Sequence, residues 1–424
     1  MSLLLRLCLI PFSLCFGCLL PAVPSSESIR KEIKDVYQAI VRIEVVSEQG
    51  SGGRMMKSRS TGSGVIISKN GLVLTNHHVA GKASRLTCRL SDGEEVMADL
   101  LGADAMTDLA LLRLRLDERD PKATPIKTAD FGNSDKVNVG DMCFAMGSPA
   151  GLSQSVTKGI ISNTALIAAS SRSFRLDGEN VGELVRWLGH DAVIYPGNSG
   201  GPLVDKNGKI IGINEVGIGS LGGAIPSNLA KNVAQELEKQ GYVSRSWVGL
   251  ECQPMIEENL SGVLVAGVIS DSPADLSEIK AGDIITKYAG TNVSARIPED
   301  IPVFNQLVYS RPANQKLWIH GFRKGKPVKW QITPAPKEPA YAKEIEVKSW
   351  GITVRNFTLM SSLEALRENK RGVQVHSTNR GGPSASAKPS LSPGDVIVSV
   401  NDKPVRSIHD LLDVSRKITR GQAE

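Results

Sequence analysis

The sequence predicts a mainly β protein in which β-barrels are followed by two smaller α+β units. Three observations support this prediction. Residues 30–225 alternate between short apolar runs and turns rich in Gly, Asn and Asp, a pattern typical of antiparallel barrels. A long helical pattern follows, and the remaining chain repeats itself at a spacing of roughly 100 to 112 residues. With 424 residues the chain is also too long for a single hydrophobic core.

The N-terminus has the pattern of an export signal. Arg6 precedes an apolar stretch from Leu7 to Leu20, which is shorter than the ~20 residues that span a bilayer and fits the core of a signal peptide. We therefore expect residues 1–24 to be a signal peptide. Cys18 ends a short segment that loosely matches a lipoprotein processing site, so lipid anchoring at Cys18 is an alternative. Any membrane association is expected only through this segment.

Composition and cysteine spacing exclude several classes of protein. A hydrophobic content of 41% with 22% charged residues is ordinary for a globular chain. The net charge of +6 includes no dense Lys/Arg run, so nucleic-acid binding is not expected. Cys88, Cys143 and Cys252 are widely spaced, which favours buried free thiols, although one disulfide pair stays open. The His and Cys spacing predicts no metal site, and no cofactor is expected.

A serine on a glycine-flanked turn is the main functional signal. Gly197-Asn198-Ser199-Gly200-Gly201-Pro202 lies between two apolar runs. Glycines on both sides of a serine allow amide N–H groups to converge on one point beside its hydroxyl. Acyl-transfer chemistry needs this geometry, so Ser199 is the candidate nucleophile.

An imidazole and a carboxyl group that could assist Ser199 lie upstream. Residues 64–68 and 71–74 predict two short strands, and the second runs into Thr75-Asn76-His77-His78-Val79. Asp108 opens the apolar run 109–114, where a buried carboxylate needs a partner such as an imidazole N–H. The order His, Asp, Ser is that of chymotrypsin. His77 is the alternative base, and Asp104 is the alternative acid.

These motifs resemble the HtrA/Deg family of trypsin-like serine proteases. The similarity covers residues 75–79, 107–112, 147–152 and 196–202, and extends to 156–162 and 224–228. It implies a chymotrypsin-like double β-barrel with a triad of His78, Asp108 and Ser199. By the same resemblance, the N–H groups of Gly197 and Ser199 form the oxyanion hole, and the residues that border the substrate pocket are Gly222, Gly223 and Ala224.

Two other motif matches are rejected because the expected helix is missing. Residues 197–201 satisfy the esterase pattern G-x-S-x-G, but a predicted hairpin follows Ser199. Residues 217–222 satisfy the dinucleotide pattern G-x-G-x-x-G, but Gly223-Ala224-Ile225-Pro226 follows instead of a helix start. A helix is predicted only from Ser227, with an apolar stripe at Leu229, Val233 and Leu237 and a stop at Gly241.

Two repeats follow that helix. Residues 246–250 and 280–285 correspond to residues 349–352 and 392–397. Both repeats resemble the PDZ domains of this protease family, in which a Gly-containing loop binds the terminal carboxylate of a peptide. By resemblance these loops are Trp247, Val248, Gly249 and Leu250 in the first repeat and Trp350, Gly351 and Ile352 in the second. Ordinary strand starts with a buried Trp are the alternative.

The domain prediction follows from these features. We expect a protease domain at 25–242, a first PDZ-like domain at 243–335, a Pro-rich linker at 336–345 and a second PDZ-like domain at 346–424. The second repeat stops soon after a predicted helix at 408–418 and has no counterpart of the strands expected at 316–320 and 326–332 in the first. It is therefore predicted to be an incomplete PDZ domain.

The resemblance departs from the family pattern in two regions. Gly223 stands where most relatives carry an aromatic residue, and His190 and Tyr195 replace the usual Thr and Asn. Side-chain preference at the cleavage site therefore stays open. The segment from Ser170 to Trp187, which includes Arg172, Arg175, Asp177 and Arg186, corresponds by resemblance to an activation loop but does not follow the family pattern.

The predicted function is an exported serine endopeptidase of the bacterial periplasm or cell envelope. The resemblance implies that it hydrolyses unfolded or damaged proteins, binds C-terminal peptides through its PDZ-like domains, and forms a homotrimer or a larger assembly. Two alternatives stay open: a catalytically silent or holdase-type peptide-binding scaffold, and a selective regulatory protease for one envelope protein.

Overall fold

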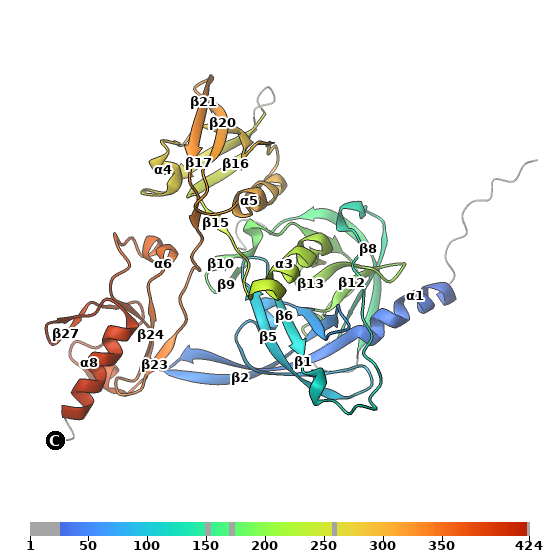
Figure 1. The fold of residues 1–424 in the computed structure, drawn as a ribbon, viewed down its shortest axis with the longest axis horizontal. Coiled ribbons are helices and arrows are strands. Elements are labelled where there is room, and N and C mark those ends of the chain that lie inside the picture. Colours follow the sequence, from blue (N-terminus) through green and yellow to red (C-terminus); the bar gives the residue numbers. More distant parts are fainter. Residues whose placement is uncertain (1–25, 149–153, 169–173, 257–260, 422–424) are drawn as a thin grey trace, which may run out of the picture.

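The computed structural model of the protein describes residues 26–148, 154–168, 174–256 and 261–421. The predicted signal peptide with Cys18, residues 149–152 of one family motif, Arg172 and residues 422–424 lie outside the described residues. In the described part, two closed β-barrels are followed by two smaller units that combine sheets with helices (Figure 1). The prediction of a mainly β fold with barrels is confirmed.

The first barrel closes with six strands in the order β1-β2-β3-β6-β5-β4. Its elements are β1 (Ile40–Ser51), β2 (Arg54–Ile66), β3 (Leu72–Thr75), the short helix α2 (His77–Ala80), β4 (Ala83–Arg89), β5 (Glu95–Asp104), β6 (Leu109–Leu114) and the 3₁₀ turn η1 (Leu116–Glu118). Because β6 lies between β3 and β5 and contacts helix α3, the four residues Leu109 to Leu112 are fully buried. The strand predicted at 109–114 is confirmed, and the one predicted at 71–74 is shifted by one residue.

The second barrel closes in the order β11-β14-β13-β12-β7-β8. Its elements are η2 (Ser134–Lys136), β7 (Met142–Gly147), β8 (Ser155–Leu166), β11 (Trp187–His190), β12 (Pro202–Asp205), β13 (Ile210–Ile218) and β14 (Leu221–Pro226). A small hairpin between β8 and β11 contains β9 (Arg175–Leu176), β10 (Glu179–Asn180) and the 3₁₀ turn η4 (Val181–Glu183). Trp187, Ile213 and Ile225 are fully buried in a core that continues into the first barrel.

Two helices flank the barrels, and only one of them was predicted. Helix α3 (Ser227–Gln240) starts and stops where the sequence indicates, with Gly241 ending it at a φ of 81°. Helix α1 (Ser26–Ala39) precedes β1 and is a correction to the prediction of only strands and turns from about residue 30. Val36 and Ala39 of α1 pack into the barrel core, so this helix is part of the first folded unit.

The first smaller unit is a sheet in the order β16-β17-β18-β20-β21, with one long helix against it. Its elements are β15 (Ser246–Trp247), β16 (Leu250–Pro254), β17 (Val263–Val268), α4 (Pro273–Leu276), β18 (Ile284–Tyr288), β19 (Thr291–Asn292), η5 (Pro298–Asp300), α5 (Ile301–Tyr309), β20 (Leu317–Arg323), β21 (Lys326–Ile332) and β22 (Ala335–Pro336). Tyr288 and Phe304 meet edge-to-face in its core. The closing strand pair expected at 316–332 is confirmed.

The second smaller unit is a sheet in the order β23-β24-β25-β26 with a separate hairpin. Its elements are β23 (Ile345–Val347), β24 (Ile352–Asn356), α6 (Leu359–Glu364), β25 (Val373–Thr378), α7 (Pro383–Ser386), β26 (Val396–Ile397), β27 (Ser399–Val400), β28 (Lys403–Pro404) and α8 (Ile408–Gly421). Within the described residues this sheet has no counterpart of β20 and β21. The helix predicted at 408–418 is confirmed and is three residues longer.

The repeat in the sequence is also a repeat in backbone geometry. Gly249 and Gly351 both have a positive φ, 79° and 62°, which glycine adopts without steric cost. The carbonyl of Gly249 accepts from the amide of Ile269 at 2.9 Å, and that of Gly351 accepts from the amide of Asn379 at 2.8 Å. The two units therefore start their second strand with the same turn.

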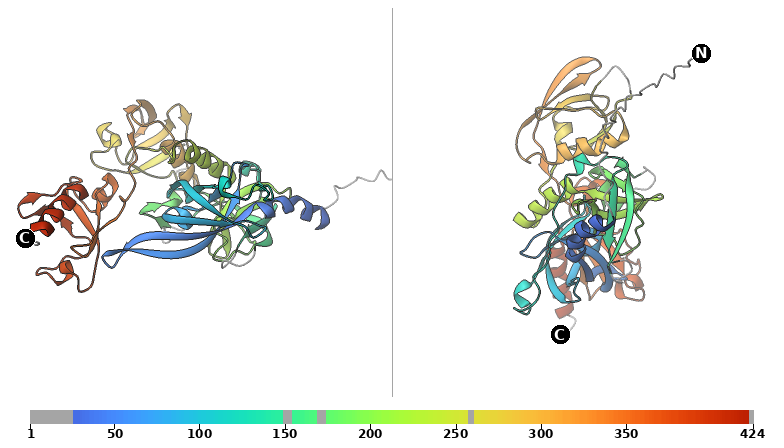
Figure 2. Two further views of the ribbon diagram at one scale, coloured as in Figure 1. Left: turned by 60° about the horizontal axis from the view of Figure 1, so that its bottom comes forward. Right: turned by 90° about the vertical axis from the view of Figure 1, so that its right-hand side faces the viewer.

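The hairpin formed by β1 and β2 reaches from the first barrel to the second smaller unit (Figures 1 and 2). At its tip, the amide of Gly50 donates to Glu344 Oε2 at 2.8 Å, and the amide of Met55 donates to Glu346 Oε2 at 3.0 Å. The amide of Gly53 donates to Ser377 Oγ at 3.0 Å. The hairpin tip is thus hydrogen-bonded to a unit that follows it by almost 300 residues, 294 in the case of Gly50 and Glu344.

Cys88, Cys143 and Cys252 are free thiols, and the first two are buried. The expectation of buried free thiols is confirmed for these two, and Cys252 is half-buried. Burial raises the pKa of Cys88 to about 12, so this thiol is protonated at neutral pH. Among the helices of the described residues, none has both the length and the apolar composition needed to cross a membrane.

Candidate active site

His78 and Asp108, two of the three residues predicted to form a triad, come from neighbouring loops of the first barrel. His78 is in α2 directly after β3, and Asp108 directly precedes β6. Because β3 and β6 pair antiparallel with Thr75 opposite Ala110, the two loops meet at one end of the strand pair. The carbonyl of Asp108 accepts from the amide of His77 at 3.1 Å, which fixes this junction.

The carboxylate of Asp108 binds His78 with both of its oxygens. Oδ2 accepts from the imidazole at Nδ1 over 2.6 Å, and Oδ1 accepts from the backbone amide of His78 over 2.8 Å. Asp108 is fully buried, whereas the side chain of His78 is 30% exposed. This arrangement places the proton of a neutral imidazole on Nδ1 and leaves Nε2 as an acceptor.

Ser199 lies on the turn that precedes β12, and glycine geometry shapes this turn. Gly197 and Gly200 have φ values of 103° and 85°. A Cβ atom at Gly200 would lie 2.1 Å from the carbonyl oxygen of Ser63, so both the dihedral and the space require glycine there. The hydroxyl of Ser199 donates to the carbonyl oxygen of Glu215 at 3.1 Å and, within the described residues, is not hydrogen-bonded to His78.

The two amides predicted to form the oxyanion hole lie on the same turn. The carbonyl of Gly197 accepts from the hydroxyl of Ser63 at 2.6 Å, and the carbonyl of Ser199 accepts from the amide of Ser63 at 2.9 Å. In the described part of the chain, the N–H groups of Gly197 and Ser199 donate to no protein acceptor. Both donors are therefore available for a substrate oxygen.

The residues predicted to border the substrate pocket lie on β14. Gly222 is opposite His190 of β11 and opposite Gly217 of β13, so it is in the middle of three paired strands. A Cβ atom at Gly222 would lie 2.4 Å from the imidazole of His190, so His190 fills the space that a side chain there would need. Burial lowers the pKa of this fully buried imidazole, which makes it neutral at pH 7. Gly223 and Ala224 are buried next to it, opposite Gly189 and Leu188 of β11.

The alternative base and acid have other partners. The Nε2 atom of His77 bonds Asp177 Oδ2 at 2.9 Å, and Asp177 also forms an ion pair with Lys82. Asp104 accepts from Thr107 and forms an ion pair with Arg245, which lies ahead of β15. In the described residues, neither the His77 side chain nor the Asp104 side chain is hydrogen-bonded to Ser199.

The segment that corresponds to an activation loop lies between the candidate triad and the first PDZ-like unit. The ring of Phe174 meets the imidazole of His78 edge-on, with 6.5 Å between ring centroids. On α5, Gln306 Nε2 donates to the carbonyl of Leu184 at 2.6 Å, and Asn305 Nδ2 donates to the carbonyl of Glu183 at 3.0 Å. One segment thus contacts both the candidate base and the long helix of the first unit.

The predicted peptide-binding loops occupy equivalent positions in the two units. In the first unit, Trp247, Val248, Gly249 and Leu250 line a cavity of about 570 Å³ together with α5 and residues of the β9–β10 segment. Trp247 and Val248 are buried. In the second unit, the carbonyl of Gly351 lies against Gly53 of the β1–β2 hairpin, and Ile352 is fully buried while Trp350 is half-buried.

Glu215 is buried on β13 beside Ser199 and was not among the predicted site residues. Its backbone carbonyl accepts from Ser199, and its side chain accepts from the indole of Trp187. A signal was present in the sequence, because a carboxyl group inside the apolar run 210–218 needs a buried partner, which is the argument applied to Asp108.

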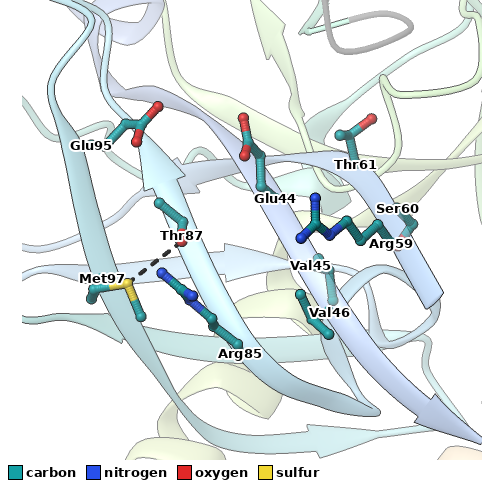
Figure 3. A pocket seen from close by; sticks show the side chains of 10 residues that line it. All are labelled: Glu44, Val45, Val46, Arg59, Ser60, Thr61, Arg85, Thr87, Glu95 and Met97. Atoms are coloured by element: carbon teal, nitrogen blue, oxygen red, sulfur yellow. Dashed lines mark hydrogen bonds between the residues drawn. The ribbon is translucent and has the colours of Figure 1, made fainter. Parts of the chain in front are cut away.

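None of these residues lines a surface hollow on the first barrel, which Figure 3 shows from close by. It is formed by β1, β2, β4 and β5 and carries charges of both signs, from Glu44, Arg59, Arg85 and Glu95. In the ranges that the structure describes, no group of three or more His, Cys, Asp or Glu side chains is placed to hold a metal ion.

Comparison with protein families gives two matches on this chain. The model of the trypsin-like peptidase domain matches residues 62–213, and the model of the PDZ domain matches residues 342–420. The first range contains His78, Asp108 and Ser199, and the second covers the second smaller unit.

Comparison with individual proteins gives relatives over most of the chain. A probable periplasmic serine endoprotease DegP-like from Pseudomonas fulva is 32% identical over 424 residues, which covers 95% of this chain and 83% of the relative. A protein of the same description from Chlamydia trachomatis is 32% identical over 371 residues, covering 83% and 69%. Among solved structures, the HtrA-type protease AlgW with tripeptide aligns with a TM-score of 0.59 and 32% identity, covering 74% of this chain and 98% of that one. The serine endoprotease from Yersinia pestis aligns with a TM-score of 0.55 and 28% identity, covering 75% and 100%.

Proposed function

Since this chain belongs to the HtrA family of DegP-like serine endoproteases with PDZ domains, we propose that His78, Asp108 and Ser199 carry out its peptide-bond hydrolysis. The observation that carries this proposal is the bond of 2.6 Å between His78 Nδ1 and the buried carboxylate of Asp108. Such a bond orients an imidazole so that its other nitrogen can take a proton from a serine.

The reaction would proceed in two halves on these residues. Ser199 Oγ attacks the carbonyl carbon of the scissile peptide while its proton passes to His78 Nε2. His78 then delivers this proton to the leaving amine, and an acyl-enzyme forms on Ser199. A water molecule attacks the acyl group, again with His78 as base, and the carboxylic acid product leaves with Ser199 restored.

Asp108 and the turn around Ser199 would stabilise the charges that develop. The carboxylate of Asp108 offsets the positive charge on His78 when the imidazole is protonated. The amides of Gly197 and Ser199 would donate to the oxyanion of the tetrahedral intermediate. Losing one such donor typically costs on the order of 2.7–4 kcal/mol of transition-state stabilisation.

Catalysis would require the hydroxyl of Ser199 to leave its bond to the carbonyl of Glu215. That bond, 3.1 Å long, directs the hydroxyl proton away from the candidate base. Rotation of the serine side chain exchanges one hydrogen bond for another, to His78 Nε2. This geometry supports a resting state in which the hydroxyl is not yet activated.

The first PDZ-like unit would regulate this step through the segment 174–184. Phe174 contacts the base, while the carbonyls of Glu183 and Leu184 accept from α5. The cavity beside the loop 247–250 is lined by α5 and by this same segment. A peptide bound there would therefore contact residues that reach the candidate triad, which supports regulation by peptide binding.

The domain boundaries proposed from the sequence are also compatible with the elements. Helix α3 ends at Gln240, next to the proposed end of the protease domain at 242, and β22 ends at the start of the proposed linker 336–345. The signal peptide 1–24 lies outside the described residues.

The enzyme is an exported protein of the periplasm, the compartment for which its relatives are named. It binds peptides, as do its solved HtrA neighbours. Unfolded or damaged polypeptides as substrates, C-terminal peptides as ligands of the PDZ-like domains, and a trimer or larger assembly belong to the proposal, supported by the family resemblance.

The test is covalent labelling of the wild-type enzyme and a Ser199→Ala variant with a fluorophosphonate, with and without unfolded β-casein. The proposal expects labelling at Ser199 only, casein cleavage by the wild type, and neither event in the variant. Faster labelling in the presence of unfolded protein would support a gated resting state. A wild-type enzyme that is not labelled under either condition would identify a silent scaffold and contradict the proposed activity.

A further inference from the structure

A second carboxyl group lies buried against the one that orients the candidate base. Glu215 is on β13 and is 5% exposed, and Asp108 is 0% exposed. The side chain of Glu215 lies close enough to that of Asp108 for the two carboxyl groups to interact directly. The two groups are 107 positions apart in the sequence (215 minus 108), so the packing of the two barrels creates this pair.

The donors around the pair are unevenly shared. Asp108 accepts two N–H groups from His78, one on each oxygen. Glu215 accepts one, from the indole Nε1 of Trp187 to its Oε2 atom. Its Oε1 atom has no donor among the described residues, although it is buried. Asp108 is the charged group that faces Glu215, and Trp187 is its other polar partner.

Two adjacent carboxyl groups in a buried site cannot both carry a negative charge at low energetic cost. The proton that they retain goes to the group whose anion is less well stabilised. Asp108 has two donors and a base that becomes positively charged, whereas Glu215 has a single neutral donor. Burial and the neighbouring Asp108 both raise the pKa of Glu215 well above its ordinary value. With a proton on Glu215, the carboxyl oxygen that lacks a donor acquires a hydrogen to give.

We propose that Glu215 is a positioning residue for catalysis, which as a neutral acid donates a hydrogen bond from its carboxyl O–H to the carboxylate of Asp108. This inference rests on the proposed triad. With this bond, a continuous series of hydrogen bonds runs from Trp187 through Glu215 and Asp108 to His78. Because the pair carries a single negative charge, His78 interacts with one anion rather than two.

Glu215 also contacts the nucleophile through its main chain. Its carbonyl oxygen accepts from the hydroxyl of Ser199 in the resting geometry, at 3.1 Å. The same residue therefore binds the acid by its side chain and the serine by its backbone. A change in the hydrogen bond between the two carboxyl groups alters how β13 holds the Ser199 hydroxyl.

The test compares the wild type with two variants of similar side-chain size, Glu215→Gln and Glu215→Met. Gln keeps an N–H for Asp108 and an oxygen for Trp187, whereas Met provides neither. The exposed Glu238→Gln on α3 is the matched control for loss of a carboxyl group far from the pair. The measurements are kcat/KM for fluorescein-labelled β-casein and the rate of fluorophosphonate labelling, each from pH 4 to pH 9.

The proposal expects Glu215→Gln to remain within about threefold of the wild type, with the acid limb of the pH profile unchanged. Glu215→Met should be slower by roughly tenfold to a hundredfold, the effect of losing a hydrogen bond to a charged group. The fall of its kcat/KM in acid should occur at higher pH, because an Asp108 carboxylate without this hydrogen bond stabilises protonated His78 more strongly.

Three results would overturn the proposal. An acid limb that moves down by about one pH unit or more in both variants would mean that an ionised Glu215 had been removed. Equal losses of kcat/KM in Glu215→Gln and Glu215→Met, or no loss in either variant, would exclude hydrogen-bond donation to Asp108 as the role of Glu215. Urea unfolding of each variant identifies a folding defect, and the Gln profile decides the question if Met does not fold. A wild type that is not labelled at Ser199 would instead contradict the proposed function, and this inference with it.

Discussion

Phe174 and His78 meet edge-to-face, with 6.5 Å between their ring centroids and 76° between their planes. His78 is the candidate base, and Phe174 belongs to a segment that is hydrogen-bonded to the first PDZ-like unit through Glu183 and Leu184. Phe174 therefore links the segment 174–184, which corresponds to an activation loop, to the residue proposed as the catalytic base.

Replacing Phe174 with Ala should lower kcat/KM for labelled casein by roughly fivefold. An aromatic pair contributes about 1 kcal/mol beyond its burial, and its loss leaves the imidazole of His78 less well oriented. Phe174→Leu keeps most of the apolar contact, so its kcat/KM should lie between those of the wild type and Phe174→Ala. Equal rates for all three proteins would show that the ring does not support the base.

Replacing Asp108 with Asn should reduce kcat by on the order of 10⁴-fold, an effect typical of this substitution in serine proteases. The amide N–H₂ can donate to Nδ1 and so favours the tautomer in which Nε2 carries the proton. Asp108 has a φ of 51°, a conformation that Asn adopts readily, so the fold should be retained. Circular dichroism checks the fold, and a kcat within tenfold of the wild type would refute the role.

Asp177 should stabilise the folded protein at neutral pH and cease to do so in acid. Burial alone would raise the pKa of Asp177, but the hydrogen bond from His77 and the ion pair with Lys82 lower it to about 2. A depressed folded-state pKa gives stability that is present above the unfolded-state value and lost as pH falls through the folded-state value, here between about 3.8 and about 2.

Asp177→Asn should therefore be less stable than the wild type at pH 7 by about 1–2 kcal/mol, after allowance for solvent screening. The difference in urea midpoint should shrink as the pH approaches 3. Asn also tolerates the φ of 51° at this position, so backbone strain is not changed. A difference that is constant from pH 7 to pH 3 would contradict the ion-pair explanation.

Gly53→Ala should separate the second PDZ-like unit from the β1–β2 hairpin. Gly53 has a φ of 72°, and a Cβ atom there would lie 2.2 Å from the carbonyl oxygen of Gly351. Gly52→Ala is the matched control, since Gly52 has a φ of 55° with nothing within 4 Å of a Cβ atom. Both variants add backbone strain, but only the first adds a clash. X-ray scattering should report a larger radius of gyration for Gly53→Ala alone.

Much of the catalytic unit was predictable, because its signals are local. The strand from 109 to 114 and the helix from 227 to 240 follow from short apolar patterns and stop residues. The motif around Ser199 predicts a tight turn because glycine is the residue that adopts the required dihedrals. Helix α1 was missed because its apolar stripe at Ile33, Val36 and Tyr37 is short and has charged neighbours.

The rest depends on contacts that no local pattern contains. The bonds from Gln306 and Asn305 to the activation segment each join residues 122 positions apart. The pairing of Glu215 with Asp108 depends on how two barrels pack. A buried carboxyl group can be suspected from an apolar run, but its partner is known only once the fold has brought distant strands together.

The bonds at the tip of the β1–β2 hairpin have a consequence for the integrity of the molecule. Hydrogen bonds join the hairpin tip to the C-terminal unit at Gly50, Gly53 and Met55. The chain that leaves the first barrel therefore passes through both smaller units and contacts that barrel's hairpin again. A peptidase that severs the stretch near residue 340 would thus leave both fragments joined by non-covalent contacts. Release of the C-terminal fragment would also require these hydrogen bonds to break.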